Sequence, residues 1–212
     1  SMSLQCVLFD LDGVLVDACE WHYLALNLAL KQLVDTEITR YDHEKTYNGL
    51  PTKIKLQKLG ITGAMAKKVW KLKQQFTIST IEKHSSVLQE KVELHSFLKD
   101  NNIKIGCVTN SIKDTAIMML EKTGQLNFID LLITNEDVAN NKPHPDCYNL
   151  ALDILKVDPK NTIIVEDSPV GYTAAKKSKV PNIWKVNNAK DTNLVNYRRY
   201  VSENFNSNGR GR

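Results

Sequence analysis

The chain has 212 residues, a net charge of +4 at pH 7, 42% hydrophobic residues and 25% charged residues. These fractions are close to globular averages and exclude a disordered or fibrous protein, and the length suits one core with a sizeable insertion. The lysines are spread along the chain instead of forming one basic block, so we expect no nucleic-acid partner.

The sequence shows neither a signal-peptide pattern nor an apolar run that approaches the roughly 18 residues required to span a membrane. The four cysteines, at positions 6, 19, 107 and 147, lack the spacing of a zinc site or a CxxC pair. We therefore expect a cytoplasmic protein with reduced thiols and no membrane contact. Ser1 before Met2 resembles a remnant of tag removal and is left out of the argument.

The first predicted strand covers residues 6–9 and is followed directly by Asp10-Leu11-Asp12-Gly13. Ligands of open α/β sheets bind beyond the carboxyl ends of the strands, which is where Asp10 and Asp12 lie. Gly13 suits a tight turn after them. Asp10 and Asp12 are therefore candidate site residues.

Residues 17–87 contain no strand pattern, and their apolar residues recur with helical spacing. One predicted stripe is Trp21, Leu24, Ala25 and Leu28, and a second is Met65, Val69, Leu72 and Phe76. We predict an all-helical cap domain over 17–87, inserted after the first strand of a core that consists of 1–16 and 88–212. The two crossings, near Asp17 and Val87, would let the cap move.

The second predicted strand, 103–108, ends in Thr109-Asn110-Ser111. Ser111 and Asp114 have the spacing of a capping box, which predicts that the amides of the next helix N-terminus face the same crevice as the Thr109 hydroxyl. Both groups can donate to phosphate. The helix that follows has its apolar stripe at Ala116, Met119, Leu120 and Thr123.

A third strand, 131–133, leads to a loop in which Lys142 is followed by Pro143, His144 and Pro145. Two prolines stiffen the backbone and can aim one cation at one place, whereas His144 is interpreted as a loop residue. The next helix has its predicted apolar stripe at Cys147, Leu150, Ala151 and Ile154.

The fourth strand, 162–165, is followed by Glu166 and Asp167, and then by Ser168 and Pro169, which suit the N-cap and first turn of a helix. Carboxylates that converge from separate strands, Asp10 and Asp12 with Asp167, suit Mg²⁺. A fifth strand covers 183–186, and the tail from Asn187 is expected to fray.

Five short strands that are apolar on both faces and alternate with helices predict a doubly wound parallel sheet of the Rossmann-like α/β class. The four strand-end motifs, taken together, resemble those of the haloacid dehalogenase superfamily over residues 5 to 186. The helical insertion resembles the alpha-helical cap of that superfamily, in the subgroup that contains beta-phosphoglucomutase and small-molecule phosphatases.

This resemblance implies an enzyme that dephosphorylates a small phosphate ester. Asp10 would be the nucleophile that forms an aspartyl-phosphate, and Asp12 would be the general acid and base. Phosphate contacts are implied for Thr109, Asn110, Ser111 and Lys142. Mg²⁺ would be bound by Asp10, the Asp12 carbonyl and Asp167, with Glu166 in support. We expect a monomer.

A sugar-phosphate mutase of the beta-phosphoglucomutase type is the main alternative. His22 matches the position of a cap-linker histidine in that enzyme, but Thr52 stands where the mutase has a phosphate-binding arginine, and Lys53 offers only a point charge. The hinge position carries Ala18, where relatives commonly have a hydroxyl residue. These departures favour the phosphatase.

A dehalogenase fits this sequence poorly, because superfamily members that cleave carbon–halogen bonds resemble a pattern without the second aspartate, whereas Asp12 is present here. The non-enzyme alternative is a phospho-acceptor or a catalytically silent binding protein, which would not turn over an aryl phosphate.

Lys53, Lys55 and Lys58 form either a solvated face or an anion clamp. A clamp would favour sugar phosphates or substrates with a second acidic group.

Overall fold

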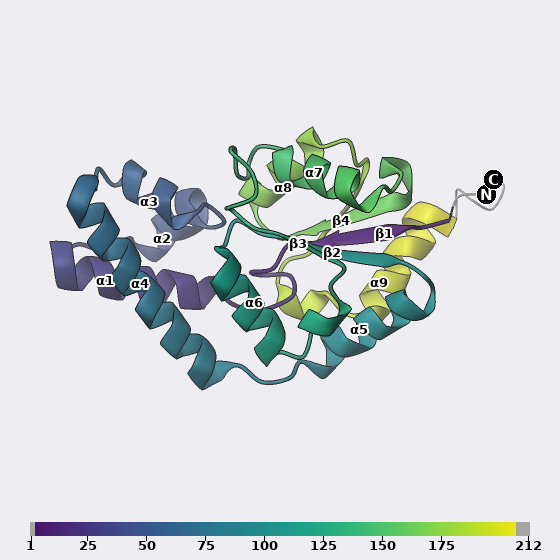
Figure 1. Ribbon diagram of the computed structural model, residues 1–212, viewed down its shortest axis with the longest axis horizontal. Helices are drawn as coiled ribbons and strands as arrows, with labels where there is room; N and C mark the ends of the chain where they lie inside the picture. Colours follow the sequence, from purple (N-terminus) through teal and green to yellow (C-terminus); the bar gives the residue numbers. More distant parts are fainter. Residues whose placement is uncertain (1–2, 207–212) are drawn as a thin grey trace.

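A parallel sheet of five strands organises residues 3–206, the part of the chain that the computed structural model describes. The strands are β1 (Cys6–Phe9), β2 (Lys104–Val108), β3 (Leu131–Ile133), β4 (Thr162–Glu166) and β5 (Asn182–Lys185), in the order β3-β2-β1-β4-β5. β1 lies at the centre and pairs with β2 on one side and β4 on the other (Figure 1). All five strands were predicted, with ends that differ by one residue at most.

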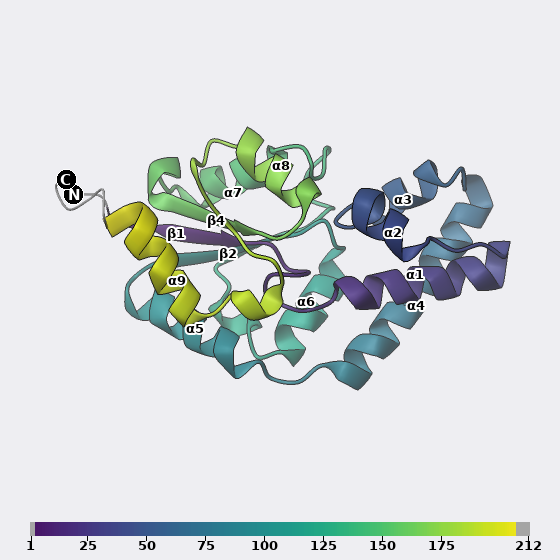
Figure 2. The same cartoon turned by 180° about the vertical axis from the view of Figure 1, so that it is seen from behind.

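Helices cover both faces of this sheet. They are α5 (Gln89–Asp100), α6 (Lys113–Lys122), α7 (Asp146–Leu155), α8 (Pro169–Lys177) and α9 (Leu194–Val201), with short turns η2 (Leu126–Phe128), η3 (Pro159–Asn161), η4 (Ala189–Asp191) and η5 (Ser202–Asn206). Figures 1 and 2 show α7 and α8 on one face and α5 and α9 on the other. The predicted doubly wound α/β core is therefore confirmed.

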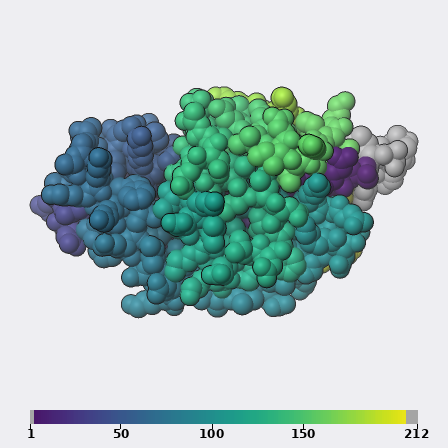
Figure 3. Space-filling model, in the orientation of Figure 1, coloured from purple at the N-terminus to yellow at the C-terminus, as the bar shows by residue number. Residues whose placement is uncertain are grey.

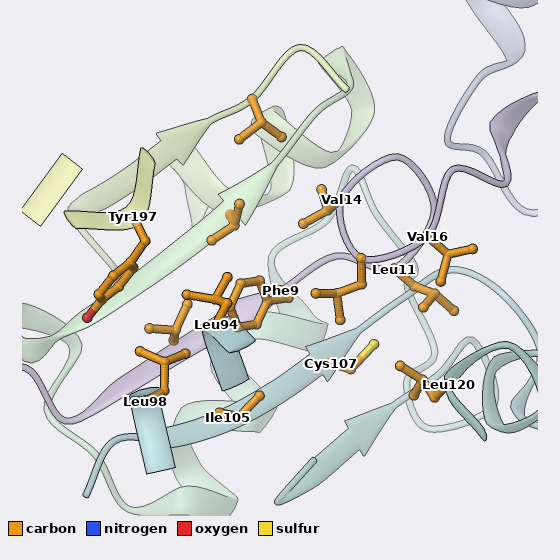
Figure 4. Close-up of a cluster of buried hydrophobic side chains, with 14 of the residues drawn as sticks. Phe9, Leu11, Val14, Val16, Leu94, Leu98, Ile105, Cys107, Leu120 and Tyr197 are labelled. Atoms are coloured by element: carbon orange, nitrogen blue, oxygen red, sulfur yellow. The ribbon is translucent and has the colours of Figure 1, made fainter. Parts of the chain in front are cut away.

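Alternate residues of each strand point to opposite faces of the sheet and belong to two separate hydrophobic clusters. Phe9 and Ile105 pack with Leu94 and Leu98 of α5 and with Tyr197 of α9 (Figure 4). Residues of the other parity, such as Leu8, pack against α7 and α8. Each fully buried Leu or Phe side chain contributes about 1.5–3 kcal/mol, so both faces of the central strand stabilise the sheet.

A helical insertion follows β1 and forms a lobe beside the sheet (Figure 3). Its elements are α1 (Cys19–Val34), α2 (Arg40–Asp42), η1 (His43–Tyr47), α3 (Thr52–Lys58) and α4 (Gly63–His84). The lobe has a hydrophobic cluster of its own, made of Leu26, Ala29, Leu30, Ile38, Leu56 and Val69. The chain joins it to the sheet through residues 10–18 and 85–88. That 17–87 move as a unit stays a prediction.

The predicted apolar stripe of α1 is partly wrong, although its member Ala25 is buried. Leu24 and Leu28 are 48% and 55% exposed, whereas Leu26 and Leu30 are buried. Leucines at every second position place apolar residues on both sides of a helix, so the periodicity alone did not identify the inner face. In α4, Val69 is buried as predicted and Met65 is exposed.

The stripe predicted for α7 is also partly wrong. Cys147 and Ala151 are buried as expected, but Ile154 is 50% exposed and Leu152 is buried instead. In α6, by contrast, the predicted residues Ala116, Met119, Leu120 and Thr123 are all buried.

The prediction of a frayed tail from Asn187 is wrong for residues 187–206, and the final Asn-Gly-Arg-Gly-Arg lies outside the described residues. Tyr197 of α9 is buried and lies edge-on to Phe97, 6.1 Å between ring centroids. Lys91 of α5 holds the segment before α9, because its ammonium donates to the carbonyls of Ala189 and Thr192. The polar composition of residues 187–206 gave no indication of these contacts in the sequence.

No helix within residues 3–206 is long and apolar enough to cross a membrane. All four cysteines are free thiols, and three of them, Cys6, Cys107 and Cys147, are buried. Burial raises the pKa of Cys6 to about 12 and of Cys147 to about 11, so these thiols stay protonated at neutral pH.

Candidate active site

A pocket of about 90 Å³ lies where the carboxyl ends of the strands meet the helical lobe. Figure 1 shows this edge of the sheet turned toward α1 and α4. Every residue predicted for the site lines the pocket, namely Asp10, Asp12, His22, Thr52, Lys53, Thr109, Asn110, Ser111, Lys142, Glu166 and Asp167. In this measure of cavity volume a single water needs about 10–15 Å³, so the pocket has room for a small substrate.

Lys142 is the central cation of the pocket. Its ammonium donates to Asp10 Oδ1 at 3.0 Å, to Glu166 Oε2 at 2.7 Å and to the Val108 carbonyl at 2.7 Å. Burial alone would lower the pKa of Lys142, but the Asp10 and Glu166 carboxylates outweigh it and raise the pKa above its ordinary value. Lys142 therefore remains charged and fixes the position of Asp10.

Asn110 holds the Lys142 loop in place through both atoms of its amide. Asn110 Oδ1 accepts from the Lys142 N–H at 3.0 Å, and its Nδ2 donates to the Lys142 carbonyl at 3.1 Å. The same Nδ2 donates to the Gly49 carbonyl of the helical lobe at 2.9 Å. Asn110 thus joins the loop, the strand end and the lobe, which the sequence did not indicate.

Glu166 is fully buried, and Tyr148, a residue that the sequence argument missed, lies against it. The Tyr148 hydroxyl donates to Glu166 Oε2, which also receives the bond from Lys142. Burial and the nearby Asp10 raise the pKa of Glu166. A Cβ on Gly171 would lie 1.9 Å from Glu166 Oε1, so only glycine allows α8 to approach this carboxylate. As predicted, Ser168 caps α8.

Three of the predicted metal ligands meet in one cluster. Asp10, Glu166 and Asp167 each offer an oxygen, and these oxygens lie within 4.8 Å of one another. Among residues 3–206, Glu166 Oε1 and Asp167 Oδ1 are buried without a hydrogen-bond partner. Burial and the charge of Asp10 raise the pKa of Asp167, a sign of uncompensated repulsion. Buried carboxylate oxygens without partners fit a hard divalent cation.

Gly13 is required beside this cluster for two reasons. Its φ of +88° lies in the left-handed region, and a Cβ there would lie 2.0 Å from Asp167 Oδ2. The loop after it is held by Gln125, whose Nε2 donates to the Leu15 carbonyl at 3.0 Å. Gln125 is fixed in turn by the buried His95, 2.9 Å away.

Asp12 points away from the metal cluster, toward Ser111 and His22. The Ser111 hydroxyl donates to Asp12 Oδ2 at 2.8 Å, and His22 Nε2 lies 3.2 Å from Asp12 Oδ1. Burial opposes ionisation of Asp12, but His22 and Ser111 outweigh it and lower the pKa to about 2. Asp12 is therefore ionised in this arrangement.

The predicted capping box of Ser111 and Asp114 is wrong. α6 begins at Lys113 without a side-chain cap from its N-cap residue, and the Lys113 N–H donates to Glu136 Oε2 at 2.7 Å. The Ser111 hydroxyl is engaged by Asp12 instead, while its N–H donates to Thr109 Oγ1 at 3.0 Å. The N-cap position of α6 is Ile112 and not Ser111, so the helix begins one residue later than the box requires and Glu136 accepts from its first N–H.

His22 connects Asp12 to a second residue that the sequence argument missed, Lys73 of α4. Lys73 Nζ lies 2.8 Å from His22 Nδ1. An ammonium can only donate, so with charged Lys73 the Nδ1 atom accepts and Nε2 carries the proton that faces Asp12. The signal was present, because Lys73 falls with Val69, Thr77 and Ile81 on the buried face of α4 at intervals of four.

The loop before α3 brings the lobe onto the strand ends. Gly49 has a φ of +91°, and a Cβ there would lie 2.8 Å from Ser168 Oγ. Thr52 is half-buried and Lys53 is exposed at the pocket rim. Of the three lysines in question, Lys53 and Lys58 are exposed, whereas Lys55 is buried and lines the pocket. The solvated-face interpretation is wrong for Lys55.

Comparison with known proteins agrees with this geometry. A family model described as haloacid dehalogenase-like hydrolase matches residues 7–185. Pyrophosphatase PpaX of Oceanobacillus iheyensis is 27% identical over 92% of this chain and 89% of its own length. A phosphorylated carbohydrates phosphatase of Thermotoga maritima is 28% identical over 86% of this chain and 85% of its own.

Among solved structures, a beta-phosphoglucomutase from Clostridium difficile superposes with a TM-score of 0.79. The two chains are 24% identical, and the match covers 94% of this chain and 98% of the other. This likeness shows a common fold of sheet and helical insertion. Because the family model covers most of the sheet and the whole insertion, the chain belongs to the haloacid dehalogenase-like hydrolases.

Proposed function

We propose that the protein is a Mg²⁺-dependent phosphatase that hydrolyses a small phosphomonoester through an aspartyl-phosphate on Asp10. The observation that carries the proposal is the position of the Asp10 carboxylate, held by Lys142 beside Glu166 and Asp167 at the strand ends. Asp12, two residues on, is held apart by Ser111 and His22 and is available for proton transfer. The relatives named as phosphatases support this reaction class.

In the first step an Asp10 oxygen attacks phosphorus, the ester P–O bond breaks, and the leaving oxygen takes a proton from Asp12. In the second step Asp12 removes a proton from the water that attacks the aspartyl-phosphate, which releases inorganic phosphate and restores Asp10. Lys142 and Thr109 orient the phosphoryl oxygens. Mg²⁺, held by Asp10, Glu166, Asp167 and the Asp12 carbonyl, would supply positive charge against the phosphoryl oxygens.

The ionised form of Asp12 described above is the form that the second step needs. For the first step Asp12 has to carry a proton, and a phosphate dianion in the pocket raises its pKa by like-charge repulsion. The same residue can therefore serve as acid while substrate is bound and as base after the alcohol has left.

We expect Asp12→Asn to slow turnover by about 10²- to 10⁴-fold on alkyl phosphates, the usual contribution of a general acid or base. The loss should be smaller on nitrophenyl phosphate, because nitrophenolate leaves without protonation. Steady-state rates on ethyl and nitrophenyl phosphate measure this difference, with the exposed Asp100→Asn as control. An equal loss on both esters would contradict the acid role.

A sugar-phosphate mutase is the second candidate, and one observation favours it: His22, the match to the mutase linker histidine, contacts Asp12. Other contacts argue against it. A mutase has to hold a distal phosphate, for which a bidentate guanidinium is the natural anchor. Thr52 lacks that group, and Arg40, 54% exposed, is bound to Glu20 at 2.8 and 2.9 Å.

Phosphate release measured against isomer formation separates the two functions. We expect release of phosphate to dominate with both anomers of glucose 1-phosphate, with or without glucose 1,6-bisphosphate, or with another metabolite phosphate found by screening. Isomerisation about tenfold faster than phosphate release or more would overturn the phosphatase. Absence of any turnover, aryl phosphates included, would favour a binding or phospho-acceptor protein instead.

A further inference from the structure

Two buried lysines of the helical lobe face the pocket and play no part in the reaction described above. Lys55 of α3 is 5% exposed and Lys73 of α4 is 3% exposed, and both line the pocket with Asp12 and His22. Lysine is almost never fully buried unless it is paired. The surroundings of these two ammonium groups therefore call for an explanation.

Neither lysine has a carboxylate partner. The Lys73 ammonium makes a single hydrogen-bond contact, to the ring nitrogen Nδ1 of His22. The Lys55 ammonium has neither a hydrogen bond nor an ion pair among residues 3–206. Asp12, the carboxylate whose charge acts on both lysines, is already engaged by Ser111 and His22.

The charges of these groups act on one another and on the pocket. Burial lowers the pKa of Lys55 to about 8 and, together with the charge of Lys55, lowers that of Lys73 to about 7. Burial lowers the pKa of both His43 and His22, and the charge of Lys55 adds to the effect on each. A buried, unpaired ammonium is destabilising, and a second one beside it adds repulsion. An anion between them would relieve both costs.

The phosphoryl group that reacts is not that anion. It has to lie against Asp10, Thr109 and Lys142 on the strand ends, whereas Lys55 and Lys73 come from helices of the lobe, with His22 between Lys73 and Asp12. The pocket thus has one buried cation on the sheet side and two buried cations on the lobe side.

We infer that Lys55 and Lys73 form a subsite for a second anionic group on the alcohol portion of the substrate, a carboxylate or a second phosphate, held by two point charges and not by the guanidinium expected of a mutase. This inference rests on the proposed phosphatase function and narrows its substrate class. Phosphate esters of uncharged sugars or alcohols would leave both ammonium groups without a partner.

Three esters with the same two-carbon skeleton test the inference: ethyl phosphate, phosphoglycolate and ethylene glycol bisphosphate. They end in a methyl group, a carboxylate and a phosphate. We expect kcat/KM to be about 10- to 100-fold higher for at least one of the two charged esters than for ethyl phosphate, as hydrogen bonds to charged groups allow. The charged ester with the higher kcat/KM shows whether the second anionic group is a carboxylate or a phosphate.

Lys55→Met is the decisive variant, because His22 Nδ1 bonds to Lys73 and not to Lys55, and because methionine fills a similar volume. It should lower the selectivity ratio between the charged ester and ethyl phosphate by about 10-fold or more. It should also raise Tm, because an unpaired buried charge is removed. Lys58→Met on the same helix and Lys68→Met on α4, both exposed, are the matched controls.

The outcomes keep this inference separate from the proposed function. Turnover of ethyl phosphate with no preference for charged esters, or a selectivity ratio unchanged in Lys55→Met, would overturn the subsite and leave the phosphatase standing. If no ester is hydrolysed, the proposed function fails, and Tm decides the subsite. The subsite is supported if phosphoglycolate raises Tm, ethyl phosphate does not, and the rise is absent in Lys55→Met. Any other Tm result overturns the subsite.

Discussion

Asp10→Asn is expected to reduce phosphate release to the background rate. An amide cannot act as the phosphoryl acceptor, and the Asp10 carboxylate lies at the meeting point of Lys142 and the Glu166–Asp167 pair. No neighbouring group can replace it, because Glu166 is fully buried and bound to Lys142 and Tyr148, and Asp12 is engaged by Ser111 and His22. Phosphate release with a generic aryl phosphate measures the effect.

The fold should survive this substitution. One carboxylate fewer relieves repulsion with Glu166 and Asp167, while Lys142 loses one charged acceptor and keeps Glu166 and the Val108 carbonyl. These opposing effects should leave Tm within a few degrees of its original value. Asp153→Asn, the same change at an exposed position of α7, is the control for both readouts. Activity near the original level would remove Asp10 as the nucleophile.

The sheet and the residues that line the pocket at the strand ends were predictable because both depend on short-range patterns. Strands such as β1 and β4 are buried on both faces and therefore nearly continuous in apolar residues. Parallel strands bring all their carboxyl ends to one edge, so Asp10, Lys142 and Asp167 had to meet once the strands were placed. That argument needs no knowledge of side-chain packing.

The rest depends on which side of a helix faces inward. In α1 two sets of leucines compete, and only contact with α4 makes Leu26 and Leu30 the buried pair. Lys55 and Lys73 were concealed in a lysine-rich segment where most neighbours are exposed. Tyr148 reaches Glu166 through the packing of α7 against the sheet, a long-range contact without a local motif.

The two sides of the pocket differ in how many partners hold their side chains. The strand ends supply fixed groups, because Lys142 and Glu166 are each held by several partners. The lobe supplies groups with few partners, such as Lys55, and it joins the strand ends through the Gly49 carbonyl and Asn110. We therefore propose that the sheet sets the chemistry and the lobe sets the selectivity, which is the arrangement expected of a movable cap.

Removal of Mg²⁺ with a chelator is expected to abolish turnover, and excess Mg²⁺ to restore it. Asp10, Glu166 and Asp167 offer oxygens within 4.8 Å of one another, and the single ammonium of Lys142 cannot balance them once a phosphate dianion enters. Calcium should inhibit, because it takes more ligands and relaxes the geometry of attack.

Binding of Mg²⁺ should also be visible without substrate, as a rise in Tm. At 100 times its Kd a ligand of the folded state contributes about 2.7 kcal/mol. That contribution corresponds to roughly 5–10 °C for a chain of this size. Asp167→Asn should remove most of the rise, because Asp167 Oδ1 is one of the two carboxylate oxygens of the cluster that are buried without a partner. Asp137→Asn is a poor control because that carboxylate binds Thr134, so the exposed Asp153→Asn serves again. Full activity in excess chelator would contradict the metal site, as would a Tm of the original protein that does not change with Mg²⁺. Asp10→Asn would then still test the nucleophile independently.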